Sequence, residues 1–199
     1  DINKSKREFM ENAVRTAVYE ATVMVLLENG LKGLKMRLVA HQAGIATGTL
    51  YNYFKDKDDL LFYVYQEVFN DFFAHLSDAA ECEISPVDKL ANVVKKYFEF
   101  VVKNIDLFKF LAETNIFQRA HKTIFREHGE KCVGVFEKIL DEGIGQGLFR
   151  KCQVTQTAGI FHGSIIGVLK TKAERDILLP KEDAKSLVEM FNAHLGIEI

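Results

Sequence analysis

The chain of 199 residues has no tryptophan, only two prolines and only three cysteines. Cys82, Cys132 and Cys152 are odd in number and far apart in sequence, which argues against a disulfide framework and fits a reducing cytosol. The sequence has no CxxC pair and no cluster of His and Cys at metal-ligand spacing. We therefore expect neither a structural metal nor a cofactor.

Long apolar runs are also missing. No stretch of about 18 uninterrupted apolar residues occurs, so the sequence predicts no membrane span. The first twelve residues, DINKSKREFMEN, carry no apolar signal core, so we expect a cytoplasmic rather than a secreted protein. The motifs GxSxG and HExxH and a glycine-rich phosphate loop are absent, and the sequence therefore predicts a protein that is not an enzyme.

What the sequence does contain is helical periodicity along its whole length. Apolar residues recur at about 3.6-residue spacing, and no strand-like alternation of useful length interrupts them. Together with sixteen phenylalanines, this pattern predicts an all-α protein with a large aromatic interior. We expect three helices in an N-terminal head, residues 1–57, and about six in a C-terminal bundle, residues 58–199.

Local signals place the helix ends. Gly30 and Gly33 are predicted to end the first helix, and Ser85 followed by Pro86 is predicted to open one as N-cap and first helical residue. Thr155 is expected to cap another helix, and Pro180 to open the last. The remaining helices are expected at about 38–43, 47–54, 58 onward, 106–115 and 121–144.

Charge is unevenly distributed along the chain. The net charge is −2, yet residues 30–57 carry five basic side chains against Asp56 alone, a local charge of +4 that leaves −6 for the remainder. A basic segment in an otherwise acidic protein is typical of a polyanion-binding site. A solvated surface face would give the same pattern, so charge alone does not decide between them.

The stretch RLVAHQAGIATGTLYNYFKDK, residues 37–57, has the layout of a helix-turn-helix. Leu38, Val39 and Ala43 are expected to face inward from its first helix. Ile45, Leu50 and Phe54 are expected to do so from the turn at Gly44 and the second helix. That arrangement leaves hydroxyl and tyrosine side chains outside, where a second helix of this motif enters the major groove of DNA.

The overlapping segment AGIATGTLYNYFKDKDDLL, residues 43–61, resembles the recognition segment of the tetracycline-repressor (TetR) family of transcriptional regulators. LLENGLKGLK is similar to the end of that family's first helix, and the specific likeness covers about residues 13–62. It implies contacts to base edges or to the groove from Arg37, Thr47, Gly48, Thr49 and Asn52. It also implies phosphate contacts from Tyr51, Tyr53 and Lys57.

Two departures from the family pattern concern helix caps. Lys35 and Met36 stand where the family usually has threonines, and Ala46 stands where a capping serine is common. Loss of an N-cap hydroxyl costs about 1 kcal/mol, which weakens the local helix but does not remove the motif. Lys35 is expected to replace the lost phosphate contact with a charge.

The resemblance further implies a C-terminal domain that dimerises and usually holds a small ligand. Gly159, Gly163 and Gly167 recur every four residues and predict a smooth helix face where another helix comes close. Such a face serves equally well for packing inside one subunit. We expect it, together with Leu187 and Phe191 of the last helix, to form a homodimer interface.

Aromatic residues from successive helices are candidates for a ligand pocket, with histidines as polar groups within it. Aromatic residues at helical spacing more often form plain core, so both interpretations stay open for each of them. The candidate set is Tyr97, Phe98, Phe108, Phe117, His121, Phe125, Phe136, Phe161 and His162.

These observations predict a homodimeric repressor that binds a palindromic operator in double-stranded DNA and is released by a small apolar or aromatic effector. One alternative is an all-helical small-molecule carrier or enzyme with a vestigial DNA-binding head. Another is a DNA-binding protein without an effector, whose aromatic helices are solid core.

Overall fold

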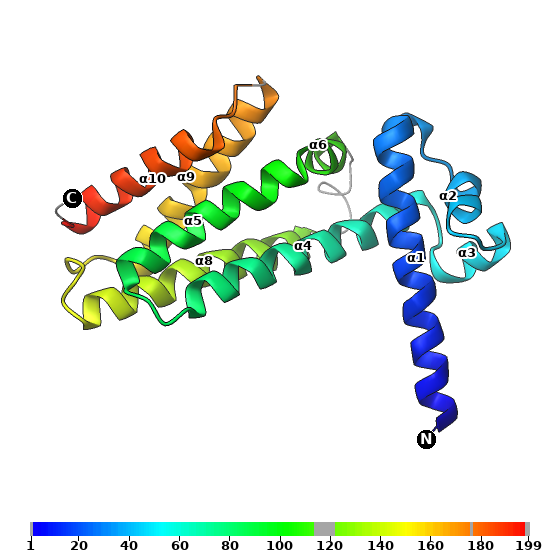
Figure 1. Cartoon of the computed structure of the whole chain (residues 1–199), viewed down its shortest axis with the longest axis horizontal. Coiled ribbons are helices and arrows are strands. Elements are labelled where there is room, and N and C mark those ends of the chain that lie inside the picture. The colour runs from blue at the N-terminus through cyan, green and yellow to red at the C-terminus, as the bar shows by residue number, and fades with distance from the viewer. Residues whose placement is uncertain (1, 114–121, 176, 198–199) are drawn as a thin grey trace. The chain divides into compact units, whose positions relative to one another are not determined.

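The computed structural model describes residues 2–113, 122–175 and 177–197, and over these ranges it consists of helices joined by short connections, without strands (Figure 1). This confirms the all-α prediction. The helices are α1 (Ile2–Gly33), α2 (Met36–Gln42), α3 (Thr47–Tyr53), α4 (Lys57–Glu81), α5 (Pro86–Lys103), α6 (Ile105–Glu113), α8 (Lys122–Gly145), α9 (Val154–Glu174) and α10 (Pro180–Leu195).

The chain forms two compact units, and the division falls inside α4. The first contains the residues up to Val68 together with most of α6. The second contains Phe69–Ile105 and the residues from Lys122 onward. The predicted boundary after residue 57 falls at the start of α4, whereas the two compact units divide after Val68. Whether function divides there stays a prediction.

The core of the first unit is built from one face of each helix. Val18 and Leu26 of α1 are completely buried, as are Val39 of α2, Leu50 of α3 and Leu60 of α4. The buried face of α1 is the one on which α2 packs. This burial fixes the short helices α2 and α3, which would not be stable alone because isolated helices of seven residues are too short.

Two glycines shape the connections of this unit. Gly30 has φ +65° and breaks the helical geometry near the end of α1, and Gly44 has φ +69° in the turn after α2. Both conformations lie in the left-handed region that favours glycine. At the second turn the Ile45 amide donates to the Ala40 carbonyl at 3.0 Å, which closes the end of α2 and directs the chain into α3.

The second unit has an aromatic interior. α5 packs against α8, α9 and α10, and α8 packs against α9. Phe98, Phe136 and Phe191 are at most 1% exposed, and the Phe161 and Phe191 rings stack with centroids 3.8 Å apart. The predicted opening of α5 is confirmed, since the Ser85 hydroxyl oxygen accepts from the Asp88 amide at 3.2 Å.

Two sequence-based expectations about local structure are wrong. α9 begins at Val154 with Gln153 as its N-cap residue, so Thr155 is not the cap. Leu38 is 36% exposed, whereas Met36 and Ala40 are buried. Because α2 starts at Met36, residues 36, 39, 40 and 43 share its inner face, and the Leu38 side chain points to the opposite side.

Candidate DNA-binding interface

α3 is amphipathic, and its outer face carries the groups predicted to contact DNA. Leu50 is fully buried and Phe54, just after the helix, is 2% exposed, so together they define the inner face. At 100° per residue, Asn52 and Gly48 lie on the opposite face, with Tyr51 and Tyr53 on its two flanks. This arrangement places amide and hydroxyl groups outward, with an aromatic phenol on each side.

Exposure follows this geometry. Tyr51 is 51% exposed, Asn52 and Gly48 are exposed, and Thr47, Thr49 and Tyr53 are half-buried. A Cβ atom added at Gly48 would meet nothing within 4 Å, so no packing inside the chain requires glycine there. Because Gly48 has no side chain, the backbone of α3 can come close to the backbone or bases of a partner at this point.

The N-terminal ends of α2 and α3 lack side-chain caps, as the sequence predicted. Lys35 precedes α2 and Ala46 precedes α3, and neither side chain makes a capping hydrogen bond. The first backbone N–H groups of each helix are therefore without a side-chain acceptor, and a helix N-terminus of this kind favours a nearby anion. Lys35 and Arg37 are exposed beside the start of α2 and add positive charge there.

Lys57 has a structural partner that the sequence did not indicate. Its Nζ donates to the Leu31 carbonyl at 2.5 Å and so binds the carboxyl-terminal end of α1. An ammonium group at this end is stabilised by the helix dipole. The role of Lys57 in gripping a phosphate stays a prediction. Lys55, two residues before Lys57, is also basic, and it is exposed to solvent.

α1 contributes side chains beside α3 that the sequence analysis did not select. An open groove of about 620 Å³ runs between the two helices, and we call it the α1–α3 groove. Its lining residues are Lys6, Met10, Glu11, Arg15, Thr49, Asn52 and Tyr53. Three of them are predicted DNA contacts, so the groove extends the predicted interface onto α1. The count of basic residues began at Gly30 and therefore missed Lys6 and Arg15.

Arg15 is held in a fixed position by aromatic rings. Its guanidinium carbon lies 5.8 Å from the Tyr53 ring centroid, 5.6 Å from that of Phe54 and 5.5 Å from that of Tyr63. Its Nε also lies 3.7 Å from a carboxylate oxygen of Glu11. Cation–π contacts of this kind orient both partners, so Arg15 steadies the Tyr53 ring at the edge of α3.

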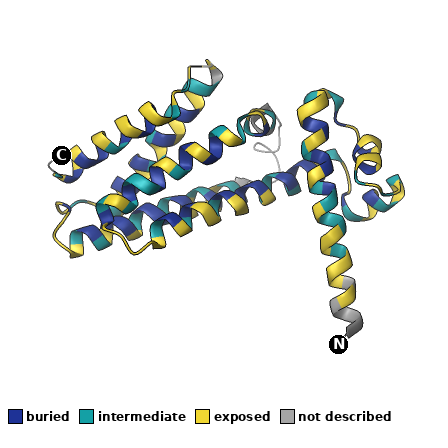
Figure 2. Cartoon of the chain, in the orientation of Figure 1, coloured by how far each residue is buried: buried dark blue, intermediate teal, exposed yellow. Residues whose placement is uncertain are grey.

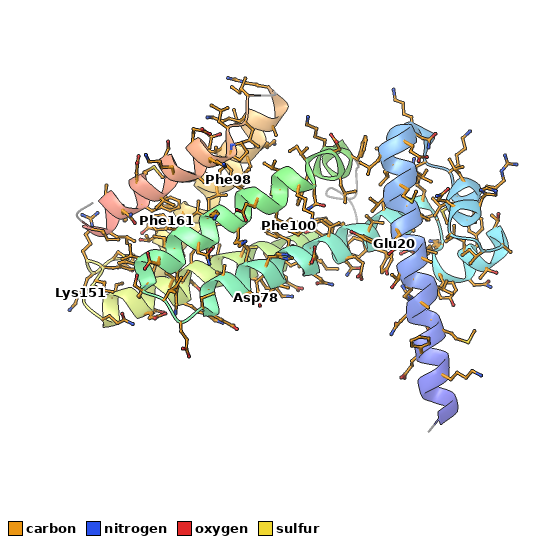
Figure 3. All side chains as sticks on the ribbon, viewed as in Figure 1. Glu20, Asp78, Phe98, Phe100, Lys151 and Phe161 are labelled. Carbon is orange, nitrogen blue, oxygen red and sulfur yellow. The ribbon has the colours of Figure 1, made fainter. Side chains whose placement is uncertain are left out.

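The predicted ligand-pocket residues do not all lie in one place. Tyr97, Phe98, Phe136, Phe161 and His162 belong to the second unit, where all but His162 are buried; Figure 3 labels Phe98 and Phe161. Phe125 is half-buried on α8, and Phe108 is half-buried and belongs to the first unit. Phe117 and His121 lie outside the described residues. A cavity lined by this set stays a prediction.

A polar pair interrupts the aromatic interior. The Tyr97 hydroxyl lies 3.0 Å from His162 Nε2, and the Phe72 and Tyr97 rings form a T-shaped contact with centroids 4.6 Å apart. Burial lowers the pKa of His162. Burial also raises the pKa of Cys132 to about 12, although a hydrogen bond with Tyr97 acts in the other direction. The Cys132 thiol is therefore protonated at neutral pH and unsuited to act as a thiolate sensor.

The predicted dimer residues divide into two groups. Gly159, Gly163 and Gly167 lie on an exposed face of α9, where an added Cβ would meet nothing within 4 Å. Leu187 and Phe191 are 6% and 0% exposed and pack inside the unit. Both belong to the core of this unit, because the inner face of α10 packs on α5 and α9, and a role for them in dimerisation stays a prediction.

Within the described residues, no helix is long and apolar enough to cross a membrane, and no three His, Cys, Asp or Glu side chains gather as metal ligands. The folded head, with its buried helix-turn-helix core and exposed polar α3, defines a protein of the DNA-binding regulator class. Two family models match the chain: the bacterial regulatory proteins of the tetR family over residues 18–64, and a tetracyclin repressor-like C-terminal domain over residues 83–170. The chain belongs to the TetR family.

Curated relatives are transcriptional regulators. The chain is 32% identical over 90 residues to the fatty acid metabolism regulator protein of Bacillus subtilis, covering 45% of this chain and 46% of the relative. It is 28% identical over 120 residues to an HTH-type transcriptional regulator of Staphylococcus aureus, covering 60% and 64%. These alignments thus span between about half and just under two thirds of the relatives' lengths.

Solved structures share the fold over nearly the whole chain. The transcriptional regulator FadR from Bacillus subtilis, crystallised with stearoyl-CoA, superposes with a TM-score of 0.75 at 23% identity, covering 90% of this chain and 98% of that one. A TetR transcription regulator from Haloarcula marismortui gives a TM-score of 0.77 at 20% identity, covering 92% and 96%. At these identities the likeness establishes the fold.

Proposed function

We propose that this protein is a homodimeric transcriptional repressor that binds operator DNA through α3. The observation that carries the proposal is the outer face of α3, where Thr49, Asn52 and Tyr51 are presented by a short helix anchored on Leu50. Amide and hydroxyl groups make base-edge and phosphate contacts in the major groove. The membership of the TetR family supports the same function.

The homodimer is proposed to form through the exposed face of α9. Besides its three glycines, this helix exposes Ile160 and Ile166, which are 55% and 42% accessible, and α10 exposes Met190 at 48%. An apolar face with small residues lets helices of a second subunit approach closely. Two-fold symmetry then presents two α3 helices to successive turns of a palindromic site, about 34–36 Å apart.

The proposed effector is a long-chain fatty acyl-CoA. The support is the likeness to a fatty acid metabolism regulator and to a regulator crystallised with stearoyl-CoA. The phenylalanine-rich interior of the second unit is chemically suited to an acyl chain. Because α4 is one continuous helix whose residues belong to both units, it is the element through which ligand binding would bias the head between two states.

DNA binding is tested by gel shift with the DNA upstream of the protein's own gene, against a random duplex of equal length. We expect sequence-dependent retardation, and Tyr51→Phe should weaken binding to both duplexes to a similar degree because it removes a phosphate contact. A protein that retards neither duplex would instead fit a carrier with a vestigial head. A change of sequence preference in Tyr51→Phe would contradict the assigned role.

The effector is tested by adding stearoyl-CoA to the preformed protein–DNA complex at fixed salt. We expect release of the duplex, whereas free coenzyme A and stearate alone should release much less, since each supplies only part of the ligand. Unchanged DNA affinity at saturating stearoyl-CoA would overturn the effector assignment and leave DNA binding intact. A reporter gene placed behind the upstream DNA should be repressed when the protein is expressed.

A further inference from the structure

We propose that the α1–α3 groove receives the sugar–phosphate backbone of the operator DNA, so that the amino-terminal half of α1 is a second wall of the DNA-binding interface. The inference rests on the proposed function and extends it to Lys6 and Arg15. Lys6 would contact a phosphate and Arg15 would position groups at the groove, and both roles depend on charge and not on DNA sequence.

The composition of the groove is the first argument. One wall carries two cationic side chains, Lys6 and Arg15, and the other carries the hydrogen-bonding side chains of Thr49, Asn52 and Tyr53. The groove has a volume of about 620 Å³ and is open to solvent. The groove is thus much larger than one small anion needs, and its cations and donors suit a polyanionic chain.

The second argument is the lack of packing along the start of α1. Among the residues of this helix whose burial is described, Val18 is the first that is buried, and Figure 2 shows the described part before it as exposed or intermediate. Phe9 and Met10 are 74% and 60% exposed. A helical segment of about a dozen residues is marginal in water without tertiary contacts. A DNA backbone lying along it would supply those contacts.

Arg15 acts here as a positioning residue. Its guanidinium lies over the rings of Tyr53, Phe54 and Tyr63, and its Nε lies close to Glu11, the one acidic side chain among the lining residues that the structure describes. This pairing offsets the negative charge of Glu11 toward an incoming phosphate. Among the described lining residues, the other positive charge of the groove is that of the exposed Lys6.

The first experiment uses the full chain and fluorescence anisotropy with the upstream and random duplexes over a series of salt concentrations. Lys6→Ala is compared with Lys151→Ala, which removes the same charge from an exposed position between α8 and α9. We expect Lys6→Ala to reduce the slope of log K against log salt by about 1, because one fewer counterion is released on both duplexes. Lys151→Ala should leave the slope unchanged, and equal slopes for the two variants would overturn the proposal.

The second experiment places a negative charge inside or outside the groove. Met10 lines the groove and its neighbour Phe9 does not, and both are exposed. At about 0.15 M salt, where charges are screened beyond about 8 Å, Met10→Glu should weaken binding at least tenfold and Phe9→Glu less than threefold. Glu11→Gln should strengthen DNA binding about twofold to fivefold. Equal losses for the two glutamate variants would contradict a backbone in the groove.

Hydrogen exchange supplies a readout that does not depend on mutation. Amides of residues 6–13 should exchange fast in the free protein and slow at least tenfold when the duplex is added. Unchanged exchange there, with protection of α3, would show that DNA binds without α1 and would overturn this inference alone. A wild-type protein that binds neither duplex would overturn the proposed function as well, which separates the two failures.

Discussion

His162 and Tyr97 form a polar contact within a largely apolar interior. Their hydrogen bond links α9 to α5, and burial of the imidazole disfavours its charged form. His128 is a second histidine of this kind, stacked on Phe69 with ring centroids 3.6 Å apart, and burial lowers its pKa as well. Both side chains are therefore neutral in the folded protein at pH 7.

These lowered pKa values make stability depend on pH in a defined direction. Near and below pH 6.5 the unfolded chain binds more protons at His162 and His128 than the folded chain does, so the free energy of unfolding falls as the pH drops. We expect His162→Gln, whose amide can still bond Tyr97, to show a smaller fall in thermal midpoint between pH 7.5 and 5.5 than the wild type. His128 contributes to the fall that remains, because its pKa is lowered as well.

The control for this prediction is His41→Gln, because His41 is exposed on α2 and outside the aromatic interior. It should reproduce the wild-type fall in differential scanning calorimetry. If the thermal midpoints of His162→Gln and His41→Gln fell equally between pH 7.5 and 5.5, burial of His162 would not be coupled to proton binding.

Single residues with one dominant physical role were predictable from sequence. The Ser85–Pro86 opening of α5, the turn at Gly44 and the uncapped starts of α2 and α3 all follow from local chemistry. The contact from Lys57 to the Leu31 carbonyl was not predictable, because it joins positions 26 residues apart through the packing of α1 and α4. A basic side chain in a basic segment carries no local sign of such a partner.

At the scale of elements, the end of α8 depends on a glycine covered by an aromatic ring. A Cβ atom added at Gly143 would lie 2.2–2.7 Å from ring atoms of Phe149, because the chain turns back after the helix. The Leu148 and Phe149 amides both donate to the Gly143 carbonyl, at 2.9 and 3.1 Å. The ring therefore has little freedom to move away.

We expect Gly143→Ala to lower the free energy of unfolding by about 1–3 kcal/mol through this overlap. Gly134→Ala on the same helix is the matched control, since an added Cβ there meets nothing within 4 Å. It should raise stability by up to about 1 kcal/mol, because alanine is the better helix former. Urea denaturation measures both, and a stabilised Gly143→Ala would show that Phe149 does not rest on Gly143.

Helix number and approximate bounds were accessible from the sequence because most helices are strongly periodic. Errors arose where a helix starts without a capping side chain, as at Val154, and where the first residue sets the inner face, as at Met36. The α1–α3 groove was missed for a different reason: it needs the spatial arrangement of two helices about forty residues apart in sequence.

At the scale of the whole molecule, the glycines of α9 have two possible uses: packing inside one subunit, or contact with a second subunit. The sequence alone left both open. In the structure, however, an added Cβ at Gly159, Gly163 or Gly167 meets nothing within 4 Å beyond its own stretch of helix among the described residues. A helix-interior glycine costs about 1 kcal/mol relative to alanine, so three on an open face favour a contact made with another molecule.

This argument predicts that Gly163→Leu dissociates the proposed homodimer while the subunit stays folded. The leucine side chain has room within the subunit, but it would hold a partner helix away. Light scattering after size exclusion should give twice the mass of one chain for the wild type and one chain mass for Gly163→Leu. Gly129→Leu, on an equally open site of α8, should remain dimeric.

DNA binding makes the same variant informative about symmetry. A monomer keeps α3 and its contacts, so Gly163→Leu should bind a single half-site about as well as the wild-type subunit does. It should lose at least tenfold in affinity for the full palindrome, because the second α3 is no longer delivered by the same molecule. A Gly163→Leu variant that stays dimeric and binds the palindrome normally would place the dimer interface elsewhere on the chain.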